Sequence, residues 1–364
     1  MMHFDLIVIG AGPAGCNFLR LLRPDLRVLL VDASCRRRKV CAGLLSPDAQ
    51  DLMARYGIHL PTEILSSPQL FRVRTVDLRT SLRRDYRRSY LNMDRSAFDN
   101  YLRSLVPSHV VIVKGPATAV SRRENRYHIS VKVSNQTEEY TADAVIGADG
   151  ASSVIRRDLF PKRPLTRYTA IQQWFHSDGA DPYYSCLFDS ETSDSCSWVF
   201  FKDDCLIFGG AFPQKNSRAR FEEQKRLALS IGALPKDAGE GAIRTEACCV
   251  ALPKSPRDLC LGGRGAYLIG EAAGLISPSS LEGISYALKS GEHLARSLNR
   301  CSSPARGICT YRLLCLPLML KVILRRAKHL ELSSPFLRGM ILRSGIHSLP
   351  PTDFIQHCER NQSI

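Results

Sequence analysis

The stretch "FDLIVIGAGPAGCNFLRLL", residues 4–22, decides the fold. It opens with a mainly apolar run of strand length over residues 4–9 and passes through a glycine-rich turn. Helical periodicity follows over residues 16–22, and residues 27–31 return to an apolar strand pattern. The sequence therefore predicts a βαβ unit at the start of an α/β sheet.

The glycine spacing in this turn fits G-x-G-x-x-G, which is weak evidence alone but stronger between a buried strand and a helix. Gly10 permits a tight turn, Gly12 lets the backbone approach a pyrophosphate, and Gly15 allows close helix packing. An acidic residue at the end of the next strand suits a ribose hydroxyl pair. The predicted dinucleotide site comprises Gly10, Gly12, Pro13, Ala14, Gly15, Asp32 and Ala33.

Such a site holds either NAD or FAD, and later segments favour FAD. Asp149 and Gly150 follow an apolar run at 144–148, and Gly270 and Glu271 follow another at 266–269. Two further acidic strand ends suggest a longer ligand with a polyhydroxylated chain, as in the ribityl group of FAD.

Composition narrows the class of protein. With 364 residues, 44% of them hydrophobic, the chain is long enough for a large core in two domains. The net charge of +15 favours phosphates, nucleic acid or an anionic membrane as partners. Because the arginine runs, such as Arg36 to Lys39, match no nucleic-acid reading module, we expect no nucleic-acid partner.

The cysteines and the apolar segments indicate a cytoplasmic protein. Thirteen cysteines are scattered without a C-x-x-C pair, which favours reduced thiols, and we expect no metal site. Glycines interrupt the apolar N-terminus, which argues against a signal peptide. The apolar stretch 313–324 is too short to span a bilayer and contains Lys321.

The pattern along the chain predicts a discontinuous nucleotide-binding domain at 1–165 and 253–300, with a short excursion into a second domain near 66–90. Short strands at 110–113, 127–133 and 139–141 are interpreted as a β-meander before residues 144–148. Alternating strands over 166–252, with a helix at 219–231, predict a second domain whose sheet covers a ligand cavity. Residues 301–364 are predicted to form a basic helical region that Pro317 breaks or kinks.

Three motifs together resemble a known group: the glycine turn, "GADGASSVIR" at 147–156 and "GEAAGLISPSSLEGI" at 270–284. The set is similar to flavoproteins of the p-hydroxybenzoate hydroxylase type, and within them to the geranylgeranyl reductase family, over residues 1 to about 345. The resemblance implies a Rossmann-like FAD-binding domain of the hydroxylase and glutathione reductase type. It also implies an inserted antiparallel β-sheet substrate domain and a C-terminal helical segment.

The resemblance assigns roles around the cofactor. Arg95 would lie at the outer face of FAD, and Asp149 and Gly150 at its entrance. Glu271 stands where the family carries aspartate, so its contact with the ribityl chain would shift by one methylene. The family also places the helix start at Gly283 and Ile284, after Pro278, at the flavin pyrimidine edge, where helix N–H groups stabilise negative charge. The alternative is a turn that merely caps a core helix.

Two further segments resemble family signatures near the ring. In "KVCAGLLSPDA", residues 39–49, Cys41 and Gly43 match a Cys-Gly-Gly segment and Ala42 replaces a glycine; the thiol either acts on the ring or is a small buried hydrophobe. In "SWVFFKDD", residues 197–204, Trp198, Phe200 and Lys202 match a substrate-cavity signature, whereas Cys196 and Phe201 depart from it. The alternative for this aromatic stripe is a packed strand. The predicted catalytic set is Cys41, Gly283 and Ile284.

The resulting prediction is an FAD-dependent oxidoreductase that reduces double bonds of an isoprenoid or polyprenyl lipid by hydride transfer from flavin N5. A flavin monooxygenase and a non-catalytic flavoprotein that binds a polyprenyl lipid are the alternatives; a flavin halogenase fits less well because its Trp-x-Trp-x-Ile-Pro pattern is missing. Without a second dinucleotide motif, electrons would come from NAD(P)H at a transient site or from another donor.

We expect a cytoplasmic monomer with a small-molecule or lipid substrate. The basic C-terminal helices suggest peripheral contact with the inner face of the membrane, through Leu313, Leu314, Leu318 and Leu320 beside Lys321, Arg325 and Arg326. The alternative is a helical cap on the cavity with a solvated basic face.

Overall fold

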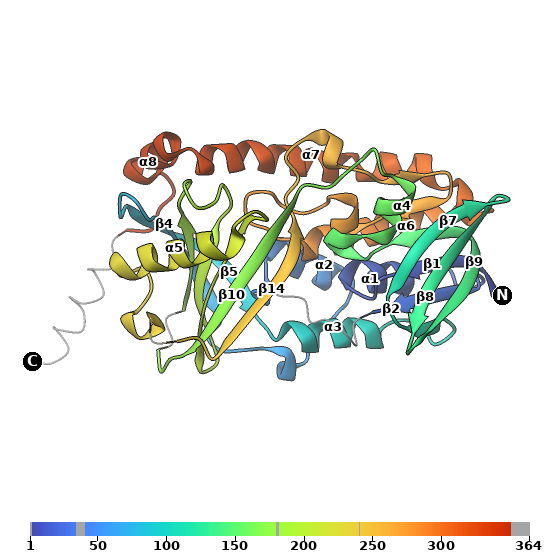
Figure 1. Cartoon of the computed structure of the whole chain (residues 1–364), viewed down its shortest axis with the longest axis horizontal. Coiled ribbons are helices and arrows are strands. Elements are labelled where there is room, and N and C mark those ends of the chain that lie inside the picture. Colours follow the sequence, from blue (N-terminus) through green and yellow to red (C-terminus); the bar gives the residue numbers. More distant parts are fainter. Residues whose placement is uncertain (1, 34–40, 180–181, 240, 351–364) are drawn as a thin grey trace, which may run out of the picture.

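A computed structural model describes residues 2–33, 41–179, 182–239 and 241–350 (Figure 1). Within these residues the strands form two sheets of eight strands each, with helices packed around them. The arginine run Arg36 to Lys39 and the last part of the predicted basic C-terminal region, 351–364, lie outside the described residues.

The first sheet is the predicted nucleotide-binding sheet. Its strand order is β15-β16-β9-β1-β2-β6, and the pairings among the five strands from β16 to β6 are parallel. The strands are β1 (Met2–Ile9), β2 (Val28–Asp32), β6 (Val111–Lys114), β9 (Gln136–Gly147), β15 (Gly262–Gly263) and β16 (Ala266–Leu268). The helix between β1 and β2 is α1 (Pro13–Leu21), which confirms the βαβ unit.

The carboxyl ends of these parallel strands meet at one edge of the sheet. The glycine turn follows β1, Asp32 ends β2, and Asp149 follows β9. The segment after β16 is a short 3₁₀ turn, η6 (Gly270–Ala273). Ligands of parallel sheets bind at this edge, so the topology gathers the motif residues that the sequence separates.

The β-meander differs from its prediction. Residues 139–141 and 144–148 do not form separate strands, because β9 is one 12-residue strand that pairs with β8 (Arg126–Val133) at its start and with β1 along most of its length. β6 pairs with β2 and takes no part in the meander. The third meander strand is β7 (Ala117–Arg123), which the sequence reading missed.

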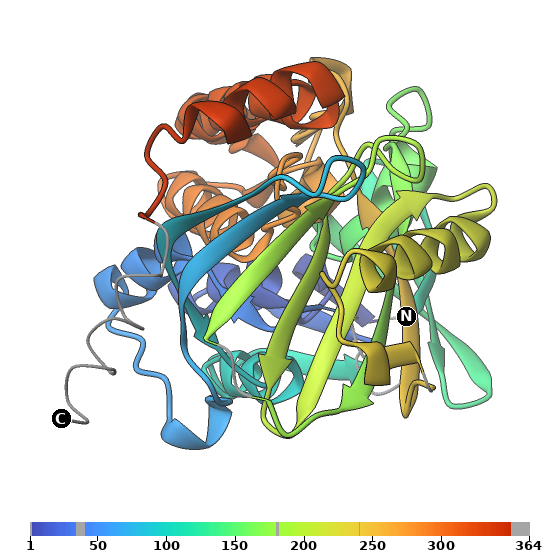
Figure 2. The same cartoon turned by 90° about the vertical axis from the view of Figure 1, so that its left-hand side faces the viewer.

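The second sheet has the order β14-β10-β13-β12-β11-β4-β5-β3 and is antiparallel except between β11 and β4. Figure 2 shows it face-on, with α5 (Ser217–Ser230) across its outer face. Its strands are β3 (Leu44–Leu45), β4 (Leu70–Asp77), β5 (Arg83–Asn92), β10 (Arg167–His176), β11 (Tyr183–Phe188), β12 (Ser197–Lys202), β13 (Cys205–Pro213) and β14 (Arg244–Ala251). Three strands of the second sheet, β3, β4 and β5, come from before residue 166. The first of them begins at Leu44, earlier than the predicted excursion near 66–90.

Side-chain alternation in β12 separates two hydrophobic clusters. Trp198 and Phe200 belong to the cluster on the inner face, whereas Val199 and Phe201 pack in the cluster that includes Phe221 of α5. This period of two is what a strand buried on both faces requires. The sheet therefore presents an aromatic inner face toward the first sheet.

Helices complete the first domain. α6 (Ile284–Leu298) packs on α1, where Asn17 Nδ2 donates to the Leu288 carbonyl over 2.7 Å. A side chain at Gly291 would meet the Ala14 carbonyl at 2.7 Å, which explains the glycine at this helix crossing. The other helices are α2 (Pro47–Arg55), α3 (Arg95–Ser104) and α4 (Val154–Leu159).

The C-terminal helices run along one outer side of the molecule. α7 (Ile308–Ser333) continues through Pro317, so the predicted break is wrong, and α8 (Pro335–Ser344) follows it. Tyr311 Oη donates to the Leu268 carbonyl and Arg338 pairs with Asp77, which fixes the two helices to both sheets. Among the described residues, no helix combines the length and the apolar character needed to cross a bilayer.

Candidate active site

A cavity of about 860 Å³ connects the carboxyl edge of the first sheet with the inner face of the second. From the predicted site its lining includes Gly10, Gly12, Pro13, Ala14, Asp32, Ala33, Cys41, Ala42, Arg95, Asp149, Gly150, Glu271, Gly283, Ile284 and Trp198. Gly15, Gly43, Gly270, Pro278, Phe200 and Lys202 do not line it. Most of the predicted cofactor residues thus share one cavity.

The glycine-rich turn has the geometry of a pyrophosphate cradle. Gly10 has φ +109°, and a Cβ there would lie 2.4 Å from the Ala148 carbonyl oxygen. A Cβ on Gly15 would lie 2.1 Å from the Gly10 oxygen, so Gly15 serves the helix packing. A Cβ on Gly12 would meet nothing within 4 Å, and no side chain caps the first turn of α1. This helix N-terminus is therefore suited to bind an anion.

Asp149 offers a buried acceptor on the cavity wall. Its Oδ2 accepts from the Val154 amide over 2.7 Å, whereas its buried Oδ1 accepts no hydrogen bond from the described residues. Burial raises the pKa of Asp149 to about 6, despite hydrogen bonds that favour the carboxylate. A buried carboxylate oxygen without a donor fits a ligand hydroxyl. The residues present therefore fit FAD.

Glu271 lines the cavity and also makes a structural hydrogen bond. Its Oε1 accepts from the Ala251 amide over 2.8 Å, at the last residue of β14, and its side chain is buried. The other oxygen lies toward Gly150, 3.6 Å from the position of a Cβ there. Glu271 thus links the end of the second sheet to the cavity wall, a role that the sequence did not reveal.

The predicted helix start at Gly283 and Ile284 also lies at the cavity. α6 begins at Ile284 with Gly283 as its N-cap, and no side chain caps its first turn. Gly283 and Ile284 both line the cavity, whereas Pro278 is buried and does not line it. Two helix N-termini, of α1 and α6, therefore reach one cavity. Residues 270–273 of the same motif, by contrast, form a 3₁₀ turn that ends at Gly274 and does not continue into an α-helix.

The segment after the undescribed residues 34–40 is held by Lys202. Cys41 and Ala42 line the cavity, and the Gly43 amide donates to Cys41 Sγ over 3.4 Å. Lys202 Nζ donates to the Met93 carbonyl over 2.6 Å, close to Gly43, which has φ +67°. Burial lowers the pKa of Lys202 to about 8. In the structure Lys202 therefore supports the Cys41 segment from outside the cavity.

Arg95 lines the cavity from the first turn of α3. Its Nε pairs with Asp99 over 2.9 Å, and both residues belong to the cavity lining. The guanidinium is thus oriented by its own helix before any ligand binds. This position is compatible with the predicted contact to the outer face of FAD.

The aromatic wall of the cavity is larger than the sequence indicated. Trp198, Tyr184 and Tyr90 line it, and Phe200 packs behind Tyr184 with ring centroids 6.0 Å apart. Tyr90 and Tyr184 lie 5.6 Å apart. Tyr90 comes from β5, and the alternation of residues 86, 88 and 90 on one face of that strand was the signal that could have found it.

Tyr90, Arg88 and Glu282 form a hydrogen-bonded trio at this wall. Tyr90 Oη donates to Glu282 Oε1 over 2.6 Å, and Arg88 Nη2 donates to the same oxygen over 2.9 Å. Tyr90 and Glu282 line the cavity, and Glu282 immediately precedes Gly283. The 270–284 motif contains Glu282, but the sequence did not predict the trio, because β5 and α6 lie far apart in the chain.

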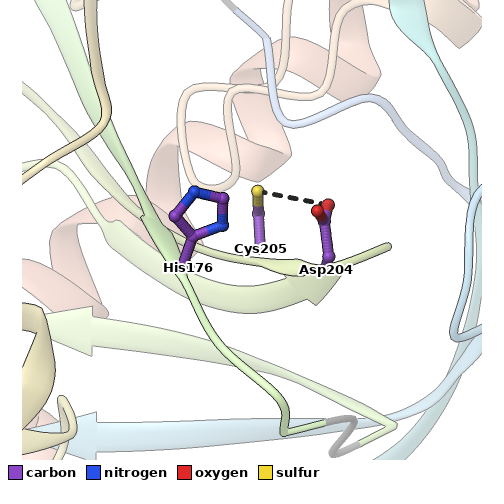
Figure 3. A group of neighbouring side chains, drawn as sticks. All are labelled: His176, Asp204 and Cys205. Carbon is purple, nitrogen blue, oxygen red and sulfur yellow. Dashed lines mark hydrogen bonds between the residues drawn. The ribbon is translucent and has the colours of Figure 1, made fainter.

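His176, Asp204 and Cys205 form a separate group, shown in Figure 3, with ligand atoms within 4.8 Å of one another. They lie at the paired ends of β10 and β13 and do not line the cavity. Burial and Asp204 raise the pKa of Cys205 to about 11. A metal ion bound by this group would have to displace the Cys205 proton.

The fold and the cavity together define a class. A Rossmann-like sheet with a glycine-rich turn and acidic strand ends, closed by a second antiparallel sheet, is the fold of FAD-dependent oxidoreductases with one dinucleotide-binding domain. The comparisons with known proteins specify the family.

The family model described as lycopene cyclase protein matches residues 5–300. Protein CbrA of Escherichia coli O6:H1 is 39% identical over 371 aligned residues, covering 99% of this chain and 100% of CbrA. The chain therefore belongs to the lycopene cyclase protein family and to the group of CbrA proteins.

Two solved structures share the fold at low identity. A geranylgeranyl bacteriochlorophyll reductase-like protein from Thermoplasma acidophilum has a TM-score of 0.77 at 20% identity, covering 92% of this chain and 88% of that one. PqsL of Pseudomonas aeruginosa, a probable FAD-dependent monooxygenase, has a TM-score of 0.68 at 18% identity, covering 94% of this chain and 100% of that one. Both likenesses concern the fold.

Proposed function

We propose that this chain is an FAD-dependent reductase of double bonds in an isoprenoid or polyprenyl lipid. The observation that carries the proposal is the continuity of the cavity, which runs from the glycine-rich turn to a wall of Tyr90, Tyr184 and Trp198. An apolar ligand on this wall would lie beside the flavin end of a cofactor bound at the turn.

The residues that would hold FAD follow from the site. The N-terminus of α1 at Gly12 would bind the pyrophosphate, Asp32 the adenosine ribose, and Asp149 a hydroxyl of the ribityl chain. The N-terminus of α6 at Gly283 would stabilise negative charge at the ring. When bound, FAD supplies hydride transfer, with electrons from NAD(P)H or another donor.

The chain itself offers a proton donor. Reduction of a double bond needs a proton at one carbon, and the Tyr90 phenol lies on the cavity wall with Glu282 and Arg88 behind it. Burial first, and the nearby Glu282 carboxylate second, raise the pKa of Tyr90, so the phenol keeps its proton at neutral pH. Tyr90 would deliver the proton by turning its hydroxyl from Glu282 to the lipid, and Arg88 would offset the negative charge of the phenolate that remains until it is reprotonated. Cys41 remains a candidate for a second proton relay at the ring.

The test is an anaerobic turnover experiment with the FAD-loaded protein. The flavin is photoreduced, polyprenyl phosphates are added, and flavin reoxidation and lipid mass are followed together. A reductase reoxidises its flavin and returns lipid that has gained two hydrogens per saturated bond.

The same experiment separates the alternatives. A lipid that co-purifies and binds while the flavin stays reduced would show a binding protein. Turnover that requires oxygen and yields a lipid with one added oxygen atom would show a monooxygenase.

A further inference from the structure

Helix α7 carries apolar side chains on two opposite sides. Its inner side packs on the domain through Tyr311, Cys315, Leu318 and Val322, which are buried at spacings of three and four residues. On the other side, large apolar side chains are 42% to 66% exposed: Leu313, Leu316, Leu320, Ile323, Leu324 and Leu330. The helical period places this second set roughly opposite the buried one.

Helix α8 extends the exposed set. Phe336 is 74% exposed and Met340 54%, and Leu337 and Ile341 are exposed beside them. Figures 1 and 2 both show α7 and α8 along one outer side of the molecule. These exposed residues of α7 and α8 are called the outer apolar face. Scattered exposed leucines are ordinary, whereas a row of them along two consecutive helices marks a surface that binds something apolar.

The charges around the outer apolar face indicate which kind of partner it would bind. Residues 308–344 contain the acidic residue Glu331 and the basic residues Arg312, Lys321, Arg325, Arg326, Lys328, Arg338 and Arg343. Lys321 pairs with Asp48 and Arg338 with the buried Asp77. Arg325 and Arg326 are half-buried, so the exposed positive charge of the two helices comes mainly from Arg312, Lys328 and Arg343. In a two-fold dimer through this face, the same cations would oppose one another. A partner with an anionic surface and an apolar interior would match both the cations and the row of exposed apolar side chains.

We propose that the outer apolar face of α7 and α8 docks the protein on an anionic lipid bilayer. The apolar side chains would enter the boundary between headgroups and acyl chains, and the flanking lysines and arginines would contact lipid phosphates. This surface differs from the sequence prediction, because Leu318 is 9% exposed and packs inward and Leu314 is half-buried. The proposal does not depend on which reaction the cavity supports.

Flotation of the full-length, FAD-loaded protein with vesicles tests the proposal. We expect binding to phosphatidylglycerol–phosphatidylcholine vesicles, little binding to phosphatidylcholine alone, and weaker binding as salt rises. Combining Leu316→Gln, Leu320→Gln and Leu324→Gln should lower binding at least about tenfold, since insertion scales with the buried apolar area.

Two further variants complete the design. Arg343→Gln removes an exposed cation near the end of α8 and should lower binding to the anionic vesicles several-fold. The matched control, Phe71→Gln with Ile243→Gln, removes exposed apolar side chains outside α7 and α8 and should bind as the parent does. Retention of FAD shows that each variant is folded.

Three outcomes would overturn the proposal. They are equal binding to neutral and anionic vesicles, no binding to either, and equal loss of binding in the Phe71 and Ile243 control. A parent protein that is dimeric in light scattering and becomes monomeric in the triple leucine variant, without vesicle binding, would assign the face to self-association instead.

Discussion

The Tyr90 hydroxyl donates to Glu282 Oε1 over 2.6 Å, joining β5 of the second sheet to the residue just before the N-cap of α6. Arg88 contacts the same carboxylate oxygen over 2.9 Å and neutralises it. The contact brings the two sides of the cavity together at the place where the α6 N-terminus opens. The Tyr90 phenol and a helix N-terminus are thus held close together through one carboxylate.

Removing the Tyr90 hydroxyl should slow double-bond reduction without loss of the cofactor. Tyr90→Phe keeps the ring on the cavity wall but removes the acid, so we expect flavin reoxidation by lipid to slow about 100-fold. Anaerobic stopped-flow absorbance measures this step. Tyr184→Phe, which alters another tyrosine of the same wall, is the control and should react at nearly the parent rate; equal rates for both variants would remove Tyr90 from the mechanism.

Gly12 and Gly15 should respond differently to alanine. A Cβ at Gly12 meets no protein atom within 4 Å, so Gly12→Ala should fold normally but bind FAD weakly, because the methyl group occupies cofactor space. A Cβ at Gly15 meets the Gly10 carbonyl oxygen at 2.1 Å, so Gly15→Ala should lower the melting temperature of the apoprotein itself. FAD titration and thermal unfolding of both apoproteins check this pair. Tight FAD binding by Gly12→Ala would contradict the proposal that the glycine-rich turn binds the pyrophosphate.

Glu271 should matter for stability through the Ala251 amide. Glu271→Ala leaves this buried N–H without its acceptor and should cost about 1–3 kcal/mol of unfolding free energy. Glu271→Gln keeps a carbonyl oxygen at the same place and should cost much less. Denaturant unfolding of the apoproteins measures the difference. If the two variants were equally destabilised, charge rather than the hydrogen bond would be the cause.

The sequence predicted the features that short motifs encode. Gly10, Gly12 and Asp32 belong to one βαβ unit, whose geometry follows from strand, turn and helix in succession. Tyr90 and Glu282 meet only because β5 joins the second sheet and α6 returns to the first, and no local pattern contains that pairing.

Side-chain direction was the other source of error. Trp198 and Lys202 share a face of β12, but the strand extends past the cavity, so the lysine reaches Met93 instead. Pro317 was expected to break or kink the helical region, yet α7 continues through it and is held on both sides by the buried Cys315 and Leu318. In both cases packing outside the motif decided the result.

Asp149 should make the stability of the apoprotein depend on pH. Its pKa is raised from 3.8 to about 6 by burial, so between these values the folded state holds a proton that the unfolded state has lost. Unfolding free energy should therefore fall as pH rises from about 4 to about 6, by on the order of 2 kcal/mol. Denaturant unfolding across this range measures the slope, and Asp149→Asn, which keeps an acceptor for the Val154 amide, should remove this contribution. A ligand hydroxyl that donates to Oδ1 favours the carboxylate form of Asp149. Bound FAD should therefore reduce the slope of unfolding free energy against pH in the parent protein. An unchanged slope in Asp149→Asn would assign the pH dependence to other groups, and an unchanged slope on adding FAD would place the cofactor away from Asp149.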